Sequence, residues 1–109
     1  MIDPIVQKKI EEMVRRIVER FHPDRIILFG SYARGEAGPD SDVDLLVVMS
    51  VPGSRRKKAT EIDISLSDRQ VPLDLLVVTP EQFERDREMI GTVIRPAVRE
   101  GKVLYERAT

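Results

Sequence analysis

Residues 30–46 read GSYARGEAGPDSDVDLL and join two apolar runs across a loop rich in glycine and aspartate. Gly30 and Ser31 follow the first run, and Asp42 and Asp44 open the second. In an extended strand, residues two apart point to the same face, so both carboxylates are expected to project together beside the glycine turn. Clustered carboxylates repel each other unless a cation neutralises them, and Mg²⁺ prefers oxygen ligands. A turn with free backbone N–H groups beside two carboxylates suits a metal-bound triphosphate.

The length and composition indicate one folded globular domain, expected to span residues 1–109. Hydrophobic residues make up 41% of the sequence and charged residues 34%, a balance that argues against a disordered chain. The formal net charge of -1 provides no basic field that would attract nucleic acid. No apolar run approaches the roughly 18–20 residues of a membrane span, so no membrane association is expected. The absence of cysteine excludes disulfides and fits the cytoplasm, where we expect the protein.

The rest of the chain alternates between helical and extended patterns. Asp3 followed by Pro4 predicts a helix start, since aspartate is a good N-cap and proline is tolerated at the first helical position. Apolar residues at helical spacing continue to Phe21, and Pro23 then ends the pattern. Short apolar runs predict strands at residues 26–29, 43–49, 73–78 and 102–106.

Two later segments are predicted to be helical. Residues 55–69 also alternate as a strand would, but their charged flanks favour a helix. Residues 79–82 read TPEQ and resemble a capping box, with threonine as the N-cap and proline at the first helical position. The helix that follows is expected to run toward Glu100 and to break near Gly91 or Pro96.

Strands that alternate with helices predict an α/β domain of two or three layers. The strand predicted at residues 73–78 carries a third aspartate, Asp74, near its start. If this strand lies beside the one that begins near Asp42 and Asp44, all three carboxylates converge at one edge of the sheet. Buried carboxylates without compensating charge would each cost several kcal/mol. Two Mg²⁺ ions shared among the three ligands would provide that compensation.

The spacing of these residues resembles a known family. Gly30-Ser31, the intervening residues 32–41, the Asp42-Val43-Asp44 triplet and a third strand aspartate look like the signature of the polymerase-beta-type nucleotidyltransferase superfamily. The short chain is similar to the minimal nucleotidyltransferase branch, and so are its segments at residues 21–29 and 101–106. The resemblance implies a nucleotidyltransferase fold of the α/β (α+β) class. Its sheet would be mixed and twisted, with about four strands and helices largely on one face.

The resemblance also implies a reaction, in which a nucleoside monophosphate moves from an NTP, with ATP favoured, to an acceptor hydroxyl and pyrophosphate is released. Gly30 and Ser31 would hold the β- and γ-phosphates through backbone N–H groups and the serine hydroxyl. The metal ligands, two ions in all, would be Asp42, Asp44 and Asp74. Of these, the third would complete the metal on the acceptor side and help to activate the attacking hydroxyl.

Two basic features have both a functional and a structural interpretation. Arg34 would neutralise triphosphate charge in the functional interpretation, and it would be a solvated arginine at the end of a helical turn in the other. The run Arg55-Arg56-Lys57-Lys58 would dock a nucleotide or RNA, or would form the solvated first turn of a helix. Cations at a helix start oppose the helix dipole, and this small cost favours an anionic contact.

Minimal members of the family often pair with a HEPN-domain toxin and act as its antitoxin, in some cases by adding AMP to a toxin tyrosine. The resemblance therefore implies a HEPN-type partner. Only residues 75–109 follow Asp74, which leaves little chain to build an acceptor pocket. Two alternatives stay open: a non-catalytic binding module that covers its toxin, and nucleotidyl transfer to a small molecule such as an aminoglycoside. For the small-molecule alternative, a homo-oligomer could build the acceptor pocket between its subunits.

Overall fold

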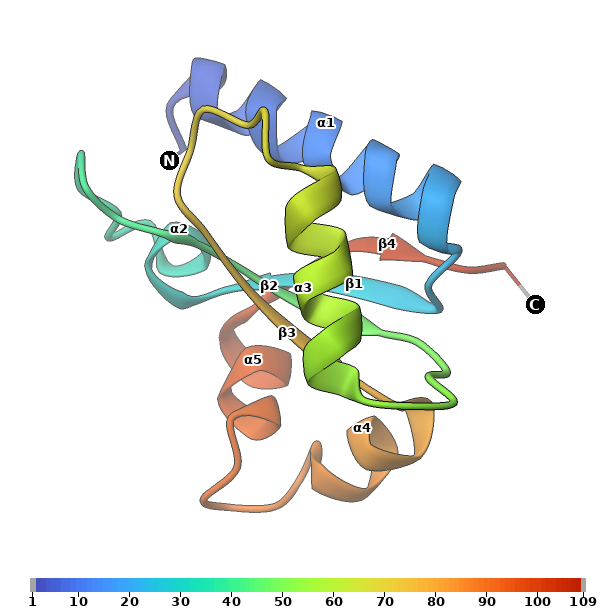
Figure 1. Ribbon diagram of the computed structural model, residues 1–109. Helices are drawn as coiled ribbons and strands as arrows, with labels where there is room; N and C mark the ends of the chain where they lie inside the picture. Colours follow the sequence, from blue (N-terminus) through green and yellow to red (C-terminus); the bar gives the residue numbers. More distant parts are fainter. Residues whose placement is uncertain (1, 109) are drawn as a thin grey trace.

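The computed structural model describes residues 2–108 and shows the predicted alternation of helices and strands (Figure 1). The elements follow one another as α1 (Pro4–Phe21), β1 (Arg25–Phe29), α2 (Gly30–Arg34), β2 (Val43–Val48), α3 (Arg55–Ser65), β3 (Leu73–Val78), α4 (Pro80–Asp86), α5 (Ile94–Glu100) and β4 (Lys102–Glu106). Among residues 2–108, no helix has the length and apolar character needed to cross a membrane.

The four strands form one mixed sheet in the order β3-β2-β1-β4. β1 is antiparallel to both β2 and β4, whereas β2 and β3 are parallel. Parallel strands need a long crossover connection, and α3 provides it between β2 and β3. The fold therefore confirms the predicted α/β class and mixed four-stranded sheet, and it places the strands that carry the aspartates side by side.

Helices cover both faces of the sheet, with the two long helices together on one face (Figure 1). α1 and α3 pack on one side through Ile10, Met13, Val14, Ile17, Ile62 and Leu66. The seven-residue helices α4 and α5 cover the opposite side through Phe83, Ile94 and Ala97. The predicted placement of the helices largely on one face thus holds for the longest pair, and the short C-terminal pair closes the other face.

The alternation of side chains along β2 decides which face carries the aspartates. Leu45 and Val47 belong to the core beneath α1 and α3, whereas Leu46 and Val48 belong to the core beside α4 and α5. β2 is thus buried on both faces, as its apolar sequence predicted. Since alternate residues share a face, Asp44 projects on the side of α4 and α5.

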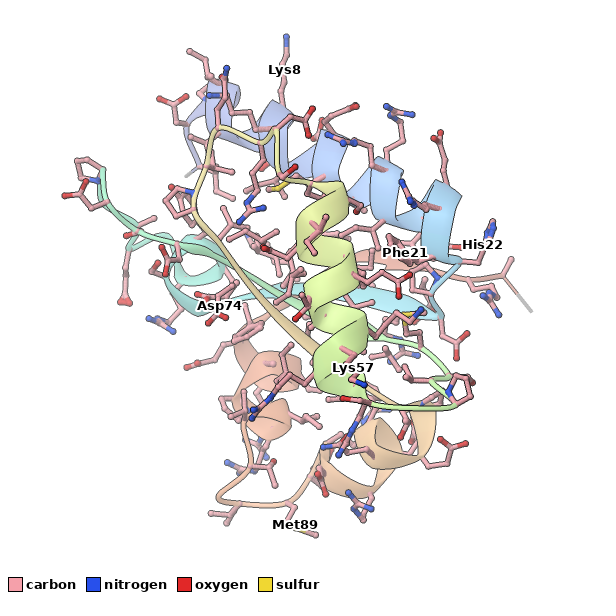
Figure 2. All side chains as sticks on the ribbon, in the orientation of Figure 1. Lys8, Phe21, His22, Lys57, Asp74 and Met89 are labelled. Carbon is pink, nitrogen blue, oxygen red and sulfur yellow. The ribbon has the colours of Figure 1, made fainter. Side chains whose placement is uncertain are left out.

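The ends of α1 follow the local sequence. The Asp3 side chain accepts a hydrogen bond from the Ile5 N–H at 2.8 Å, and Pro4 occupies the start of the helix, as predicted. At the other end, which Figure 2 marks with the labels Phe21 and His22, the chain turns at His22 with a left-handed φ of 52°. The His22 N–H donates to the Val18 carbonyl at 3.1 Å and so caps the helix.

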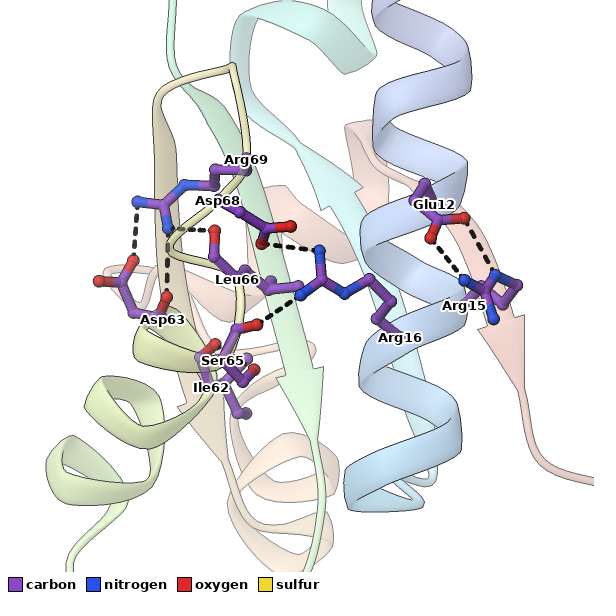
Figure 3. Close-up of polar contacts among 9 residues, drawn as sticks. All are labelled: Glu12, Arg15, Arg16, Ile62, Asp63, Ser65, Leu66, Asp68 and Arg69. Carbon is purple, nitrogen blue, oxygen red and sulfur yellow. Dashed lines mark hydrogen bonds and ion pairs between the residues drawn. The ribbon is translucent and has the colours of Figure 1, made fainter.

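The end of α3 depends on a residue from another element (Figure 3). The predicted helix reached residue 69, but α3 ends at Ser65. Arg16 of α1 donates to the Ser65 carbonyl at 2.7 Å, and Arg69 donates to the carbonyls of Asp63 at 3.2 Å and Leu66 at 3.1 Å. These arginines satisfy carbonyls that a longer helix would have used itself, so the chain leaves the helix early and enters the loop before β3.

The C-terminal helical stretch divides at one of the two predicted positions. α4 ends at Asp86 and α5 begins at Ile94, and Gly91 lies between them with φ of 95°. Pro96 does not break a helix, because it lies in the first turn of α5, where its missing N–H leaves no hydrogen bond unmade. The Thr79 side chain accepts from the Gln82 N–H at 3.1 Å, which confirms the predicted N-cap of α4.

Candidate active site

The two strand aspartates lie next to each other at the start of the parallel pair. Asp44 and Asp74 are the second residues of β2 and β3, and the strand register pairs them directly. Asp42 precedes β2 by one residue, and it lies near enough for its negative charge to raise the pKa of Asp44. Figure 2 shows Asp74 where β3 begins. Because β2 and β3 are neighbours, the three carboxylates gather at the end of the sheet where these two strands begin.

The glycine turn lies directly against one of these carboxylates. Gly30 begins α2 with φ of 74°, a left-handed conformation that side chains disfavour. A Cβ added to Gly30 would lie 2.1 Å from Oδ2 of Asp44, so only glycine leaves room for the carboxylate. The antiparallel register pairs Phe29 with Asp44 and so brings the turn to this position. Ser31 follows within the same helical turn and is half-buried.

The charges of the aspartates act on one another. Burial raises the pKa of Asp44, and the negative charges of Asp74 and Asp42 raise it further. Arg34 acts in the opposite direction, but its guanidinium donates to Glu36 at 2.9 Å rather than to an aspartate. Asp42 and Asp74 are exposed, whereas Asp44 is half-buried. The site thus carries an excess of negative charge at its most buried point, which a cation would relieve.

The donor set fits a hard divalent cation, although the side chains do not form a closed cage. Within residues 2–108, no group of three or more His, Cys, Asp or Glu side chains lies in metal-binding geometry. Mg²⁺ does not require such a cage, because it usually keeps several waters and binds one or two carboxylates together with substrate phosphates. The oxygen ligands of Asp42, Asp44 and Asp74 are of the type that it prefers, and the raised pKa of Asp44 marks where positive charge is needed.

A groove of about 480 Å³ runs beside β3, and the sequence pattern did not reveal it. Its walls come from α3, β3, α4 and the segment that enters α5, so no local motif marks it. The residues of the basic run 55–58 differ in their relation to this groove. Arg55 and Arg56 line it, whereas Lys58 pairs with Glu61 at 3.2 Å.

Two proteins of known name are similar to this chain in sequence. The chain is 32% identical over 104 residues to "Putative protein adenylyltransferase MJ0604" of Methanocaldococcus jannaschii, a match that covers 91% of this chain and 97% of the relative. It is also 41% identical over 54 residues to "Putative protein adenylyltransferase MJ0141" of the same organism, covering 50% of this chain. That second match spans about half of the relative, 54% of its length.

Solved structures share the fold at lower sequence identity. A nucleotidyltransferase structure from Sulfolobus solfataricus, described as putative, superposes with a TM-score of 0.62 at 20% identity and covers 92% of this chain and 79% of that one. A chain from a toxin–antitoxin complex with AMP-PNP superposes with a TM-score of 0.57 at 23% identity, covering 89% and 73%. The family model of the nucleotidyltransferase domain matches residues 8–104. This chain therefore belongs to the nucleotidyltransferase domain family and is a nucleotidyltransferase.

Proposed function

We propose that this nucleotidyltransferase moves AMP from ATP to a hydroxyl on a partner protein, in a reaction that depends on Mg²⁺. The approach of Gly30 to Asp44 carries this proposal, because it joins a turn suited to phosphates with a carboxylate suited to a metal. The choice of AMP and of a protein acceptor rests on the name of MJ0604, which aligns with this chain over 97% of its length.

The residues of the site have separate roles in the proposed reaction. Gly30 and Ser31 would bind the β- and γ-phosphates through backbone N–H groups and the serine hydroxyl. Asp42 and Asp44 would hold the metal, and Asp74 would complete its ligands on the acceptor side. Arg34 would bind the triphosphate by exchanging Glu36, its present partner at 2.9 Å, for a phosphate oxygen.

The reaction is an in-line displacement at the α-phosphorus. Asp74 lies at the exposed side of the site, where it would accept the proton of the attacking hydroxyl. The hydroxyl oxygen bonds to the α-phosphorus while the bond to the bridging oxygen breaks, and pyrophosphate leaves with that electron pair. Bound Mg²⁺, two ions in our proposal, would neutralise the phosphate charges and stabilise the entering and leaving oxygens.

We propose that the acceptor protein is a toxin of the HEPN type and that this chain is its antitoxin. Two structural neighbours come from toxin–antitoxin complexes, one solved with AMP-PNP and one that carries the names MntA and HpeT. The second superposes with a TM-score of 0.59 at 21% identity over 98% of this chain, a likeness of fold. The exposed position of Asp74 agrees with an acceptor brought by a separate protein.

The position of the radioactive label in ATP tests this proposal. The purified protein is incubated with Mg²⁺ and a lysate of its native host, with ATP labelled at either the α- or the γ-phosphate, and proteins are separated on a gel. We expect a band labelled only from the α-phosphate and only by wild type, not by the Asp42→Asn/Asp44→Asn double variant. A band labelled from the γ-phosphate, or one that the double variant also produces, would contradict the proposal. A label found only in small molecules would support the aminoglycoside-type alternative instead.

A further inference from the structure

The groove beside β3 follows the open edge of the sheet. Four consecutive residues of the strand, 75–78, line it. Successive side chains of a strand point to opposite faces, so a hollow that touches four in a row must face the edge of the strand and not one side of the sheet. Arg55 and Arg56 form the wall on the α3 side, and Thr92 to Ile94 form the wall on the α5 side.

The backbone groups that face this groove can be assigned from the pairing of β3 with β2. The Val43 N–H donates to the Pro72 carbonyl at 2.9 Å, and the Met49 N–H donates to the Val78 carbonyl at 3.0 Å. Because backbone groups alternate sides with a period of two, residues 72, 74, 76 and 78 face β2. The N–H and C=O groups of residues 73, 75 and 77 therefore face the groove. Within residues 2–108, β3 pairs with no strand other than β2.

The two edges of the sheet differ in how they are protected. β4 pairs irregularly with β1, with a bulge at Ile26/Ile27, and it carries charged residues at both ends, Lys102 and Glu106. Such features discourage an added strand. β3 pairs with β2 in unbroken register over six residues, and Asp74 is the only charged residue in its sequence LDLLVV, which leaves residues 75–78 uncharged. Edge strands of this unprotected kind accept another strand readily.

The charges along the groove indicate what kind of strand it would accept. Arg55 donates a hydrogen bond to Gln82 of α4, so it lies near the end of β3, and Arg56 forms no ion pair within residues 2–108. Asp86 also lines the groove, but its carboxylate is paired with Arg85 at 3.0 Å. At the opposite end, Asp74 is the second residue of β3. An extended segment with an acidic side chain at one end and a hydroxyl at the other fits this distribution.

We infer that the edge of β3 binds an extended segment of the acceptor protein as a fifth strand and so presents its hydroxyl to Asp74; this rests on the proposed function. Backbone hydrogen bonds to Leu75 and Val77 would hold the segment, and Arg55 with Arg56 would select an acidic residue. From Asp74 to Val78 the strand extends roughly 13 Å at 3.3 Å per residue, so the hydroxyl and the acidic residue lie about four positions apart.

Hydrogen exchange measured by NMR tests this inference without ATP, so its result is independent of transfer. The probes are synthetic peptides that carry tyrosine and glutamate about four residues apart, separated by valine and threonine, in both chain directions. We expect one direction to slow exchange at the amides of Leu75 and Val77 by about tenfold or more, since these N–H groups gain partners. The amides of Leu76 and Val78 already face β2 and should change little. The same peptide with N-methyl groups on those alternate backbone nitrogens that would face β3 should lose this protection.

A charge-reversal pair provides the matched control. The Arg55→Glu/Arg56→Glu variant should weaken binding of the peptide by about tenfold or more, because it replaces attraction with repulsion at the acidic residue. Lys57→Glu, an exposed position on the same helical turn that does not line the groove, should change binding less than about twofold. Both variants place glutamate at a helix start, where it favours the helix, so both should fold.

Three results would overturn the inference. One is unchanged exchange at Leu75 and Val77 with either peptide direction, and another is equal protection by the N-methylated peptide. The third is protection of both amides in the free protein together with a solution mass of two chains, since a second copy would then occupy the edge. If the peptide binds at β3 but the α-phosphate label never reaches a protein, the docking surface stands and the proposed transfer reaction fails.

Discussion

The contact between Gly30 and Asp44 defines the site at the scale of single residues. The sequence predicted a glycine turn and a pair of aspartates, each from its own local pattern. It placed both carboxylates beside that turn, but it did not predict the direct contact of Gly30 with Asp44, because this contact depends on the register that pairs Phe29 of β1 with Asp44 of β2. The Asp44 carboxylate lies so close to Gly30 that a Cβ would collide with it. Position 30 therefore requires glycine for space as well as for its backbone conformation.

Replacing Gly30 with alanine should damage both the fold and the reaction. The new Cβ would lie 2.1 Å from Oδ2 of Asp44, and the left-handed φ of 74° adds strain. We expect the free energy of unfolding to fall by about 1–2 kcal/mol from the backbone conformation alone and transfer of the α-label to be lost. Urea denaturation and the transfer assay measure the two effects. Gly38→Ala is the control, since its Cβ meets nothing within 4 Å; equal behaviour of the two variants would refute this view of Gly30.

The raised pKa of Asp44 predicts how stability depends on pH when divalent ions are absent. Between the ordinary carboxyl value and the raised one, the folded state holds more protons than the unfolded state at this residue. The free energy of unfolding should therefore fall as pH rises through that interval. Asp44→Asn should remove this fall and make the protein more stable than wild type at neutral pH. Urea denaturation across pH measures the effect, with Asp40→Asn, an exposed loop position, as the control; a wild-type profile for Asp44→Asn would contradict it.

At the scale of the elements, local signals were sufficient where one residue acts on its own helix. Asp3 and Thr79 cap their helices as the sequence predicted, because a cap needs only the next few residues. The prediction for the end of α3 was wrong by contrast. Arg16, a distant residue of α1, donates the hydrogen bond to the Ser65 carbonyl at the point where the helix ends. A guanidinium from another helix leaves no mark in the local sequence, and the predicted helix was consequently too long.

Gly101 provides a test of how closely α5 packs on the sheet. A Cβ at this position would lie 2.1 Å from the Ala97 carbonyl oxygen, 2.7 Å from Cγ2 of Ile27 and 2.8 Å from the Leu28 carbonyl oxygen. Gly101→Ala should therefore force α5 away from β1 and lower the free energy of unfolding by about 1–3 kcal/mol. Gly53→Ala, with nothing within 4 Å of its Cβ, should change it by less than about 0.5 kcal/mol. Thermal denaturation compares the two; an unchanged melting temperature for Gly101→Ala would rule out this close packing.

For the whole molecule, the sequence predicted the α/β class and the four strands but not their order. The three aspartates converge only because β2 and β3 are neighbours, and the sequence of neither strand indicates which strand it pairs with. The same limit applies to the groove, whose walls meet only after α3, α4 and α5 have packed around β3. The roles of Asp42, Asp44, Asp74 and Arg34 remain predictions, supported by the positions in which the fold places these side chains.

Rates of transfer to the labelled acceptor, measured for single substitutions in the purified protein, test whether the three aspartates form the active site. We expect Asp42→Asn, Asp44→Asn and Asp74→Asn each to lower the initial rate by about 100-fold or more, because each removes a group that stabilises transition-state charge. Asp40→Asn, in the same loop and exposed, should retain the wild-type rate. A wild-type rate in any of the three variants, with the fold intact by circular dichroism, would show that the carboxylates at the start of β2 and β3 do not form the active site.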